Sequence, residues 1–396
     1  MKAWHFSENA YPYLPPEDEY ESIRVNLPNS NYDPAKGAEL YDRFLDEWCI
    51  AEDEGLEIML NEHHQTATCV DPAAPVVLGA LARLTKKARL LILGNPVANR
   101  RQPVRVAEEM ALIDILSRGR LECGFVRGVP YEVLPANSNP VRMNERQWEA
   151  MDLIVKAWTS HDGPFSHEGR FFHHRNVNIW PRPWQQPHPP IWVSTTTPSG
   201  AKRVGTRGYV QATFLTGYKG TRPVFDAYRA GWREAGRGND VPINRLAYAA
   251  LVYVGETEAA ARSGAEKLLW YMTSNKVPPH YMYPPGYVPP AAYAAILRGA
   301  ALDQHAANRA NATVDKAVES GLMFAGTPDQ VYDQIKRMYD HVGGFGHLLI
   351  MGQAGFLEHD ETVAGIRNFA RHVYPRLKEA FPDTSISAPQ AERVVA

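Results

Sequence analysis

The stretch LILGNPVANRRQPVRVAEEMALIDILSRGRLECGFVRG, residues 91–128, holds the pattern that decides the fold. It joins two apolar runs, ARLLILG (88–94) and LECGFV (121–126), and each run predicts a strand. Between them, Pro103 suits the first turn of a helix over residues 103–117. Because both strands are continuously apolar rather than alternating, both faces of their sheet should be covered. This pattern is typical of a parallel sheet with helices outside it.

The same alternation of short strands and longer helices extends in both directions along the chain. Strands are predicted over residues 2–6, 56–60, 88–94, 121–126, 191–194, 209–214, 246–254 and 347–351. Helices are predicted over residues 38–54, 73–85, 103–117, 143–158, 198–206, 222–235, 256–271, 328–341 and 361–373. About eight parallel strands with crossover helices predict a protein of the α/β class with a (β/α)8 barrel. An open doubly wound sheet is the competing arrangement.

Two segments interrupt the pattern within what we expect to be a single barrel domain over residues 1–396. Residues 163–190 are rich in aromatic residues, His and Pro, and they predict a hairpin and an excursion from the barrel. Residues 273–312, with YMYPPGYVPP at their centre, match no strand–helix repeat and predict an insertion or lid. An oligomer contact is the alternative role for its aromatic side chains. The tyrosines in and next to this segment are Tyr271, Tyr281, Tyr283, Tyr287 and Tyr293.

The composition excludes several classes of function. Hydrophobic residues make up 44% and charged residues 22% of the 396 residues, as in an average globular protein. Lys and Arg total 42 against 44 for Asp and Glu, so the net charge of −2 favours neither nucleic acid nor an anionic membrane as a partner. Without a secretory pattern at the N-terminus or a long apolar window, a cytoplasmic location is expected. Cys49, Cys69 and Cys123 have no metal-like spacing, and no metal is expected.

Active sites of (β/α)8 barrels lie at the carboxyl ends of the strands, so the polar residues that follow each strand are candidates. After the second strand, Glu62, His63 and His64 could supply a general base and a partner that orients it. A structural histidine pair and a metal site are the alternatives. After the third strand, Gly94 and Asn95 either allow close approach of a flat ligand or form an ordinary turn.

An anion site is predicted after the fourth and fifth strands. Arg127 is flanked by glycines and suits contact with a phosphate or carboxylate, although it could also be a surface residue. The hydroxyls of the loop 194–200 precede a predicted helix, where they could bind an anion or simply cap the helix. If the barrel closes, both segments converge on one anion. The chain contains neither the Rossmann G-x-G-x-x-G motif after a strand nor a P-loop.

Over nearly its whole length, apart from residues 273–312, the chain resembles the bacterial luciferase-like flavin monooxygenases. The segments that carry the resemblance are LNEHHQT (60–66), residues 91–128, PPIWVSTTTPSGAKRVG (189–205), AGTPDQV (325–331) and FARHVYPRL (369–377). The resemblance implies an FMN-dependent monooxygenase of the two-component type. Reduced FMN and O2 would form a flavin C4a-peroxide that oxygenates a small organic substrate. Because the chain lacks a dinucleotide fingerprint, a separate NAD(P)H:flavin reductase is the expected partner, and a homo-oligomer is expected.

The resemblance also assigns roles to single residues near the histidine pair. His63 matches the catalytic histidine of the family, and it would act as a general base or as a hydrogen-bond donor. Glu62, His64, Tyr131 and Tyr283 are expected to contact the substrate.

A second group of residues is expected to bind FMN. Arg127 resembles the ligand of the FMN phosphate, and Gly94 and Asn95 fall where the family places a non-proline cis peptide beneath the flavin ring. The remaining phosphate cradle is expected to be Thr195, Thr196 and Ser199. Luciferase itself has a glutamate near Thr195 and a reactive cysteine where this chain has Val126, and the second difference argues against light emission.

Two other functions are compatible with these motifs. A deazaflavin-dependent oxidoreductase on the same fold would transfer hydride without oxygen. A non-catalytic flavin-binding protein would use the cofactor site without turnover. The motifs do not name the substrate or separate hydroxylation from Baeyer–Villiger insertion, heteroatom oxidation or carbon–sulfur cleavage.

Overall fold

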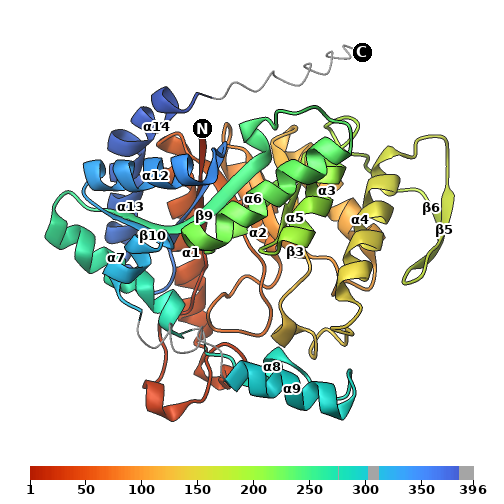
Figure 1. Cartoon of the computed structure of the whole chain (residues 1–396), viewed down its shortest axis with the longest axis horizontal. Coiled ribbons are helices and arrows are strands. Elements are labelled where there is room, and N and C mark those ends of the chain that lie inside the picture. The colour runs from red at the N-terminus through yellow and green to blue at the C-terminus, as the bar shows by residue number, and fades with distance from the viewer. Residues whose placement is uncertain (275, 302–311, 383–396) are drawn as a thin grey trace.

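The computed structural model describes residues 1–274, 276–301 and 312–382, and a closed barrel of parallel strands lies at its centre (Figure 1). The order around the barrel is β1–β2–β3–β4–β7–β8–β9–β11, and β11 pairs with β1 to close it. These strands are β1 (Lys2–Ser7), β2 (Glu57–Leu60), β3 (Leu90–Pro96), β4 (Leu121–Val126), β7 (Ile191–Ser194), β8 (Val210–Phe214), β9 (Leu246–Val254) and β11 (His347–Gln353). The predicted (β/α)8 barrel is confirmed, and the open sheet is excluded.

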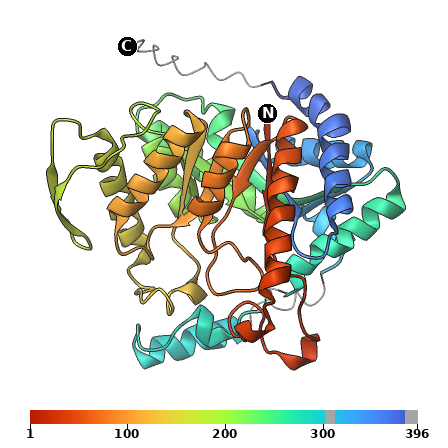
Figure 2. The same ribbon diagram turned by 180° about the vertical axis from the view of Figure 1, so that it is seen from behind.

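Helices connect the strands and surround the barrel (Figures 1 and 2). They are α1 (Pro34–Asp53), α2 (Ala74–Leu84), α3 (Pro103–Ser117), α4 (Met143–Thr159), α5 (Pro198–Arg207), α6 (Gly217–Glu234), α7 (Glu258–Ser274), α11 (Val314–Glu319), α12 (Pro328–Val342), α13 (His359–Asn368) and α14 (Tyr374–Ala380). The last predicted helix, 361–373, begins earlier and continues through a π-helical turn, Phe369–Val373, into α14. Among the described helices, none combines the length and apolarity needed to cross a membrane.

One strand was not predicted. Strand β10 (Met323–Gly326) pairs with Leu251–Val254 at the far end of β9. The near end of β9, Leu246–Ala249, pairs with β8. On this side, β9 therefore pairs first with β8 and then with β10, which explains its length.

Alternation along the strands sorts the apolar side chains into two layers. Trp4 and Phe6 of β1 belong to the interior of the barrel, whereas Ala3 packs in the layer between strands and helices. Trp4 and Trp192 meet near the amino ends of their strands, with ring centroids 5.4 Å apart. The indole Nε1 of Trp4 donates to Nδ1 of His347 at 3.1 Å. Because aromatic side chains fill this end, open space remains at the carboxyl ends of the strands.

Two segments extend beyond the barrel. Residues 163–190 include an antiparallel hairpin, β5 (Phe165–Glu168) and β6 (His173–Val177), which projects beside α4 in Figure 1. Helices α8 (Pro279–Met282) and α9 (Pro290–Ala301) lie below the barrel in Figures 1 and 2, at the end opposite the N-terminus. Of the predicted insertion, residues 275 and 302–311 lie outside the described residues.

Candidate active site

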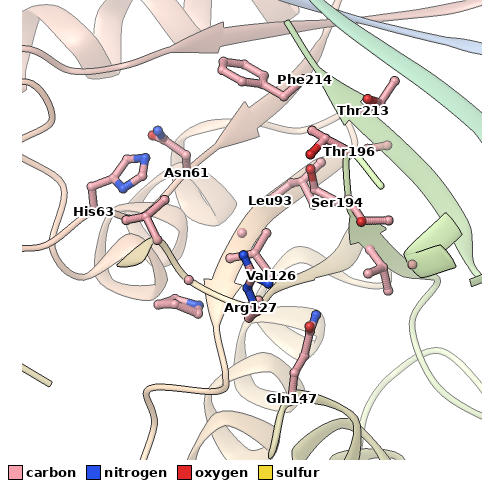
Figure 3. Close-up of a pocket in the computed structure, with 18 of the residues that line it drawn as sticks. Asn61, His63, Leu93, Val126, Arg127, Gln147, Ser194, Thr196, Thr213 and Phe214 are labelled. Carbon is pink, nitrogen blue, oxygen red and sulfur yellow. The ribbon is translucent and has the colours of Figure 1, made fainter. Parts of the chain in front are cut away.

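A cavity of about 740 Å³ opens at the carboxyl ends of the barrel strands. Its floor consists of apolar side chains and small residues of the strands, namely Phe6, Met59, Leu93, Gly94, Val126, Val193, Ala212, Phe214, Ala249 and Leu349. Polar side chains gather on opposite sides of this floor: in Figure 3, Asn61 and His63 lie on one side of Leu93, and Ser194 and Thr196 lie on the other. We call these sides the histidine end (Glu8, Arg24, Asn61, His63, Tyr131, Glu132 and Tyr271) and the β7–α5 end (Arg127, Thr195, Thr196, Ser199, Gly200 and Arg203).

The loop between β7 and α5 brings hydroxyl groups to the start of a helix. Thr197 caps α5, and its side chain accepts a hydrogen bond from the Gly200 N–H at 3.3 Å. Thr195 Oγ1 accepts one from the Thr197 N–H, also at 3.3 Å. A Cβ atom on Gly200 would lie 2.5 Å from Thr195 Oγ1, so this close packing requires glycine. The loop therefore presents hydroxyls and helical N–H groups to the cavity together, as an anion site needs.

Two arginines complete the β7–α5 end. Arg127 follows β4 and is exposed, and it has no hydrogen bond or ion pair to any residue that the structure describes. Arg203 follows Ser199 by four residues on α5, and its Cζ lies 4.4 Å from the centroid of the Trp148 ring. Sequence reasoning missed Arg203, although its helical spacing from Ser199 could have indicated it. Among the described lining residues, this end has no carboxylate, so it suits a dianion such as a phosphate.

The strands β3 and β4 approach each other closely at the floor. The peptide bond between Leu93 and Gly94 is cis, one residue before the Gly94–Asn95 pair that the resemblance indicated. A Cβ on Gly94 would lie 2.1 Å from Cγ1 of Val126, so glycine lets the two strands approach closely. Asn95 is fully buried and is not part of the lining, with its Oδ1 3.5 Å from Nε of Arg100. Gly94, and not Asn95, contributes to the surface of the floor.

His63 is held by a hydrogen bond on each ring nitrogen. Its Nδ1 lies 2.8 Å from Oε1 of Glu132, and its Nε2 lies 3.4 Å from a terminal nitrogen of Arg24. Because a guanidinium can only donate, Nε2 accepts from Arg24 and Nδ1–H donates to Glu132, which assigns a neutral imidazole. Burial acts to raise the pKa of Glu132, but the hydrogen bonds from the His63 side chain and from the His64 backbone N–H outweigh it and hold that pKa below its usual value. Glu132 therefore stays ionised and orients the ring.

Glu8 and Arg24 bring buried charges of opposite sign to the histidine end. Glu8 directly follows β1, and its Oε2 accepts a hydrogen bond from Nδ2 of Asn61 at 2.9 Å. Arg24, in the long loop before α1, donates through Nε to the hydroxyl of Tyr131 at 2.6 Å. Both charged side chains are almost fully buried. Tyr131 also lines the cavity.

The remaining predicted residues divide between the cavity and the layer behind it. Glu62 lines the cavity, and its Oε1 accepts from Arg100 at 2.6 Å and contacts Nε2 of His64 at 3.0 Å. The hydrogen bond to Glu62 raises the pKa of His64 above its usual value. His64 is not among the residues that line the cavity. The two histidines of the pair therefore face different surroundings.

The roof of the cavity comes from the segment after α7. It consists of Val277, Pro279, Met282 and Tyr283. Tyr271 of α7 also lines the cavity and is buried, whereas Tyr281, Tyr287 and Tyr293 are not among the lining residues. Part of the predicted aromatic segment thus covers the cavity, while its other tyrosines lie away from it.

Comparison with known proteins places these residues in a wider context. A family model described as luciferase-like monooxygenase matches residues 25–344. The oxygenase component of a flavin-dependent trigonelline monooxygenase from Acinetobacter baylyi is 33% identical over 165 residues, which are 41% of this chain and 45% of that protein. This chain thus aligns with less than half the length of that relative.

Two solved structures have a similar fold. The monooxygenase RslO1 from Streptomyces bottropensis superposes with a TM-score of 0.72 at 21% identity and covers 95% of this chain and 99% of its own. The oxygenating constituent of 3,6-diketocamphane monooxygenase from Pseudomonas putida, a type II Baeyer–Villiger monooxygenase in complex with FMN, gives a TM-score of 0.68 at 18% identity, covering 95% of this chain and 98% of its own. At these identities, the similarity establishes the fold.

Proposed function

Because the chain belongs to the luciferase-like monooxygenase family, we propose that it is the FMN-dependent oxygenase of a two-component system. In this proposal it uses O2 and reduced FMN, delivered by a separate NAD(P)H:flavin reductase, to oxygenate a small organic substrate. The observation that supports the proposal most is the β7–α5 end, where two arginines, three hydroxyls and the start of a helix meet beside an apolar floor.

The side chains present fit FMN. The phosphate would be held by Arg127 and Arg203 together with the hydroxyls of Thr195, Thr196 and Ser199. The flat ring system would rest on the apolar floor at Leu93, Gly94 and Val126, where glycine keeps the surface low. When bound in reduced form, FMN supplies the electrons for oxygen activation, which no side chain of the protein can provide.

The protein's own groups would position the substrate and move a proton. Nε2 of His63 would accept a proton from the substrate once the substrate replaces the long hydrogen bond from Arg24, while Glu132 stabilises the imidazolium that results. Tyr283 and the other roof residues would exclude water from the reacting groups. His63 lies on one side of Leu93 and the β7–α5 loop, with Ser194 and Thr196, lies on the other (Figure 3), which leaves the floor between them for the flavin ring and the substrate.

Arg127→Ala is expected to weaken FMN binding by about 1.5–3 kcal/mol, the contribution of a charge-assisted contact to phosphate. Riboflavin, which has no phosphate, should bind with nearly the same affinity to the variant and to the wild-type protein. Fluorescence titration of both flavins measures the difference. Arg105→Ala, at an exposed arginine on α3, is the control and should change neither affinity. An equal loss of affinity for FMN and riboflavin would contradict the phosphate assignment.

With NAD(P)H and FMN alone, the chain is expected to oxidise NAD(P)H at a negligible rate, because it carries no dinucleotide-binding fingerprint. Addition of an unrelated flavin reductase should allow product formation, followed by mass spectrometry on a substrate panel. The rate of NAD(P)H oxidation is measured by the loss of absorbance at the NAD(P)H band. Rapid NAD(P)H oxidation by the isolated chain would show that the reductase activity is internal.

Flavin binding by the purified protein, and its effect on the reaction of reduced flavin with O2, distinguish the proposed function from its alternatives. Purification with bound FMN, or selective binding of FMN over a deazaflavin, supports the monooxygenase. Selective binding of a deazaflavin would favour the hydride-transferring oxidoreductase. FMN binding with no effect of the protein on the reaction of reduced flavin with O2 in stopped-flow mixing, whatever the substrate, would indicate a flavin-binding protein.

A further inference from the structure

Arg24 is a buried cation with no carboxylate within ion-pair distance among the described residues. Its side chain is only 2% exposed. Its hydrogen bonds go to the hydroxyls of Tyr131 and Thr68 and to Nε2 of His63. Within the described part of the chain, no ion pair joins its guanidinium to an acidic side chain. Buried charges are normally paired, because their desolvation is unfavourable, and here the nearby charge of Glu8 stabilises the guanidinium without a direct contact, so its N–H groups remain open to a ligand.

The guanidinium has the hydrogen-bonding capacity to accept such an anion. Three of its five N–H groups are used by Tyr131, Thr68 and His63. Each terminal nitrogen therefore keeps one further N–H group. Arg24 also lines the cavity. Two N–H groups on neighbouring nitrogens match the two oxygens of a carboxylate, which is the usual geometry of a bidentate pair.

The surroundings restrict which carboxylate would fit. Glu8 and Glu132 line the same end of the cavity and repel anions, so a carboxylate fits only where Arg24 donates to it directly, and a second negative charge would have no such donor. Aromatic side chains surround the space between this end and the floor, namely Phe6, Tyr131, Phe214, Tyr271 and Tyr283. Aromatic rings on several sides favour a planar, apolar body over a branched or highly hydroxylated one.

We propose that Arg24 determines substrate specificity by binding the carboxylate of a small aromatic monocarboxylate. The inference rests on the proposed function, since it assigns a substrate class to the same cavity. Because Arg24 Nη2 lies 3.4 Å from His63 Nε2, a ring anchored on Arg24 lies next to the imidazole. The loop that carries Arg24 is also joined to the chain leading into the roof, since the hydroxyl of Ser22 donates to the carbonyl oxygen of Lys276.

The test compares acids with amides of the same shape on the FMN-saturated protein. Benzoate and benzamide, and nicotinate and nicotinamide, are titrated by calorimetry. The wild-type protein is expected to bind each acid at least about tenfold more tightly than its amide, as a charge-assisted contact predicts. In Arg24→Met this preference should fall to about twofold or less, and Arg24→Lys should keep part of it because the charge remains.

Controls separate this site from the β7–α5 end. Arg24→Met also removes the hydrogen bonds to Tyr131, Thr68 and His63, so FMN titration first checks that the variant is folded, and Arg24→Lys, which keeps the charge, is the second variant. Arg127→Met should lower FMN affinity and leave the preference for acids intact. Loss of the preference in Arg127→Met instead of Arg24→Met would place the carboxylate at the other end and overturn the proposal. Equal binding of acid and amide by the wild-type protein, or no binding of any acid, also overturns it without the need for a variant.

FMN binding is measured first, by fluorescence, so that a failure of the proposed function can be distinguished from a failure of the carboxylate proposal. If the chain binds no FMN, the proposed function is wrong. The titrations are then repeated on the cofactor-free protein in phosphate buffer, where inorganic phosphate competes for the β7–α5 end. A preference for acids that depends on Arg24 under those conditions supports the carboxylate site, and its absence refutes it.

Discussion

Replacement of His63 with alanine is expected to lower turnover by about 10²–10⁴-fold, the usual contribution of a positioned acid or base. The variant removes the one imidazole that lines the cavity among the described residues, together with the Nε2 lone pair that would accept the proton. FMN affinity should stay within about threefold of the wild-type value, because the phosphate donors lie at the other end of the floor. The measurements are turnover with a flavin reductase and a verified substrate, and fluorescence titration of FMN.

His64→Ala is the matched control, since it removes the neighbouring imidazole of the same sequence pair. Its side chain contacts Glu62 behind the lining and does not reach the cavity, so the effect on turnover should be much smaller. If His64→Ala impairs turnover more than His63→Ala does, the assignment of the catalytic role to His63 is wrong, and His64 carries it. Full turnover in both variants would make the histidines structural.

Asp71→Asn is expected to stabilise the protein at alkaline pH by about 2–4 kcal/mol. Asp71 is 1% exposed, and burial, together with the charge of Glu62, raises its pKa from 3.8 to about 7. Between these two values the folded chain holds a proton that the unfolded chain has released. Stability therefore falls as pH rises through this window and stays lower above pH 7. Asparagine cannot ionise, so the variant escapes this loss.

Denaturant unfolding of the wild-type protein and Asp71→Asn at pH 4 and pH 8 measures the effect. The difference in unfolding free energy between the two proteins should be small at the lower pH and large at the higher one. Asp42→Asn, at an exposed position on α1, should follow the wild-type pH profile. A difference between wild type and Asp71→Asn that does not change with pH would show that Asp71 ionises normally in the folded protein.

Most of the barrel could be predicted from local patterns, because parallel strands covered on both faces leave continuous apolar runs. Strand β10 could not, since MFAG is only four residues long and its pairing depends on β9 extending past β8. The start of α6 was also missed. Its first residues, GYKG, contain two glycines, and this start is held by side-chain hydrogen bonds. Thr221 Oγ1 donates to the Gly217 carbonyl oxygen, and the Gly217 N–H donates to the hydroxyl of Tyr248.

The candidate site was predictable wherever a functional residue follows a strand within three residues. This rule indicates His63 and Arg127, and applied to the first strand it would also have indicated Glu8. Arg24 and Glu132 lie further along their loops, and no local pattern distinguishes a loop arginine that folds into the barrel mouth from one in solvent. Their burial depends on long-range contacts such as the one between Arg24 and Tyr131. The sequence therefore predicts His63 and Arg127, one residue at each end of the cavity, but not the buried charges of Arg24 and Glu132 next to His63.

The two ends of the cavity draw largely on different parts of the chain. In the histidine end, Glu8, Arg24, Asn61 and His63 come from the first 63 residues, and only Tyr131, Glu132 and Tyr271 come from later segments, whereas the phosphate donors lie between Arg127 and Arg203. During divergence, substitutions near the N-terminus can therefore alter which molecule is oxidised without disturbing cofactor affinity. A chimera that takes its first two strands and their loops from a relative should accordingly inherit that relative's substrate preference while retaining its own flavin affinity.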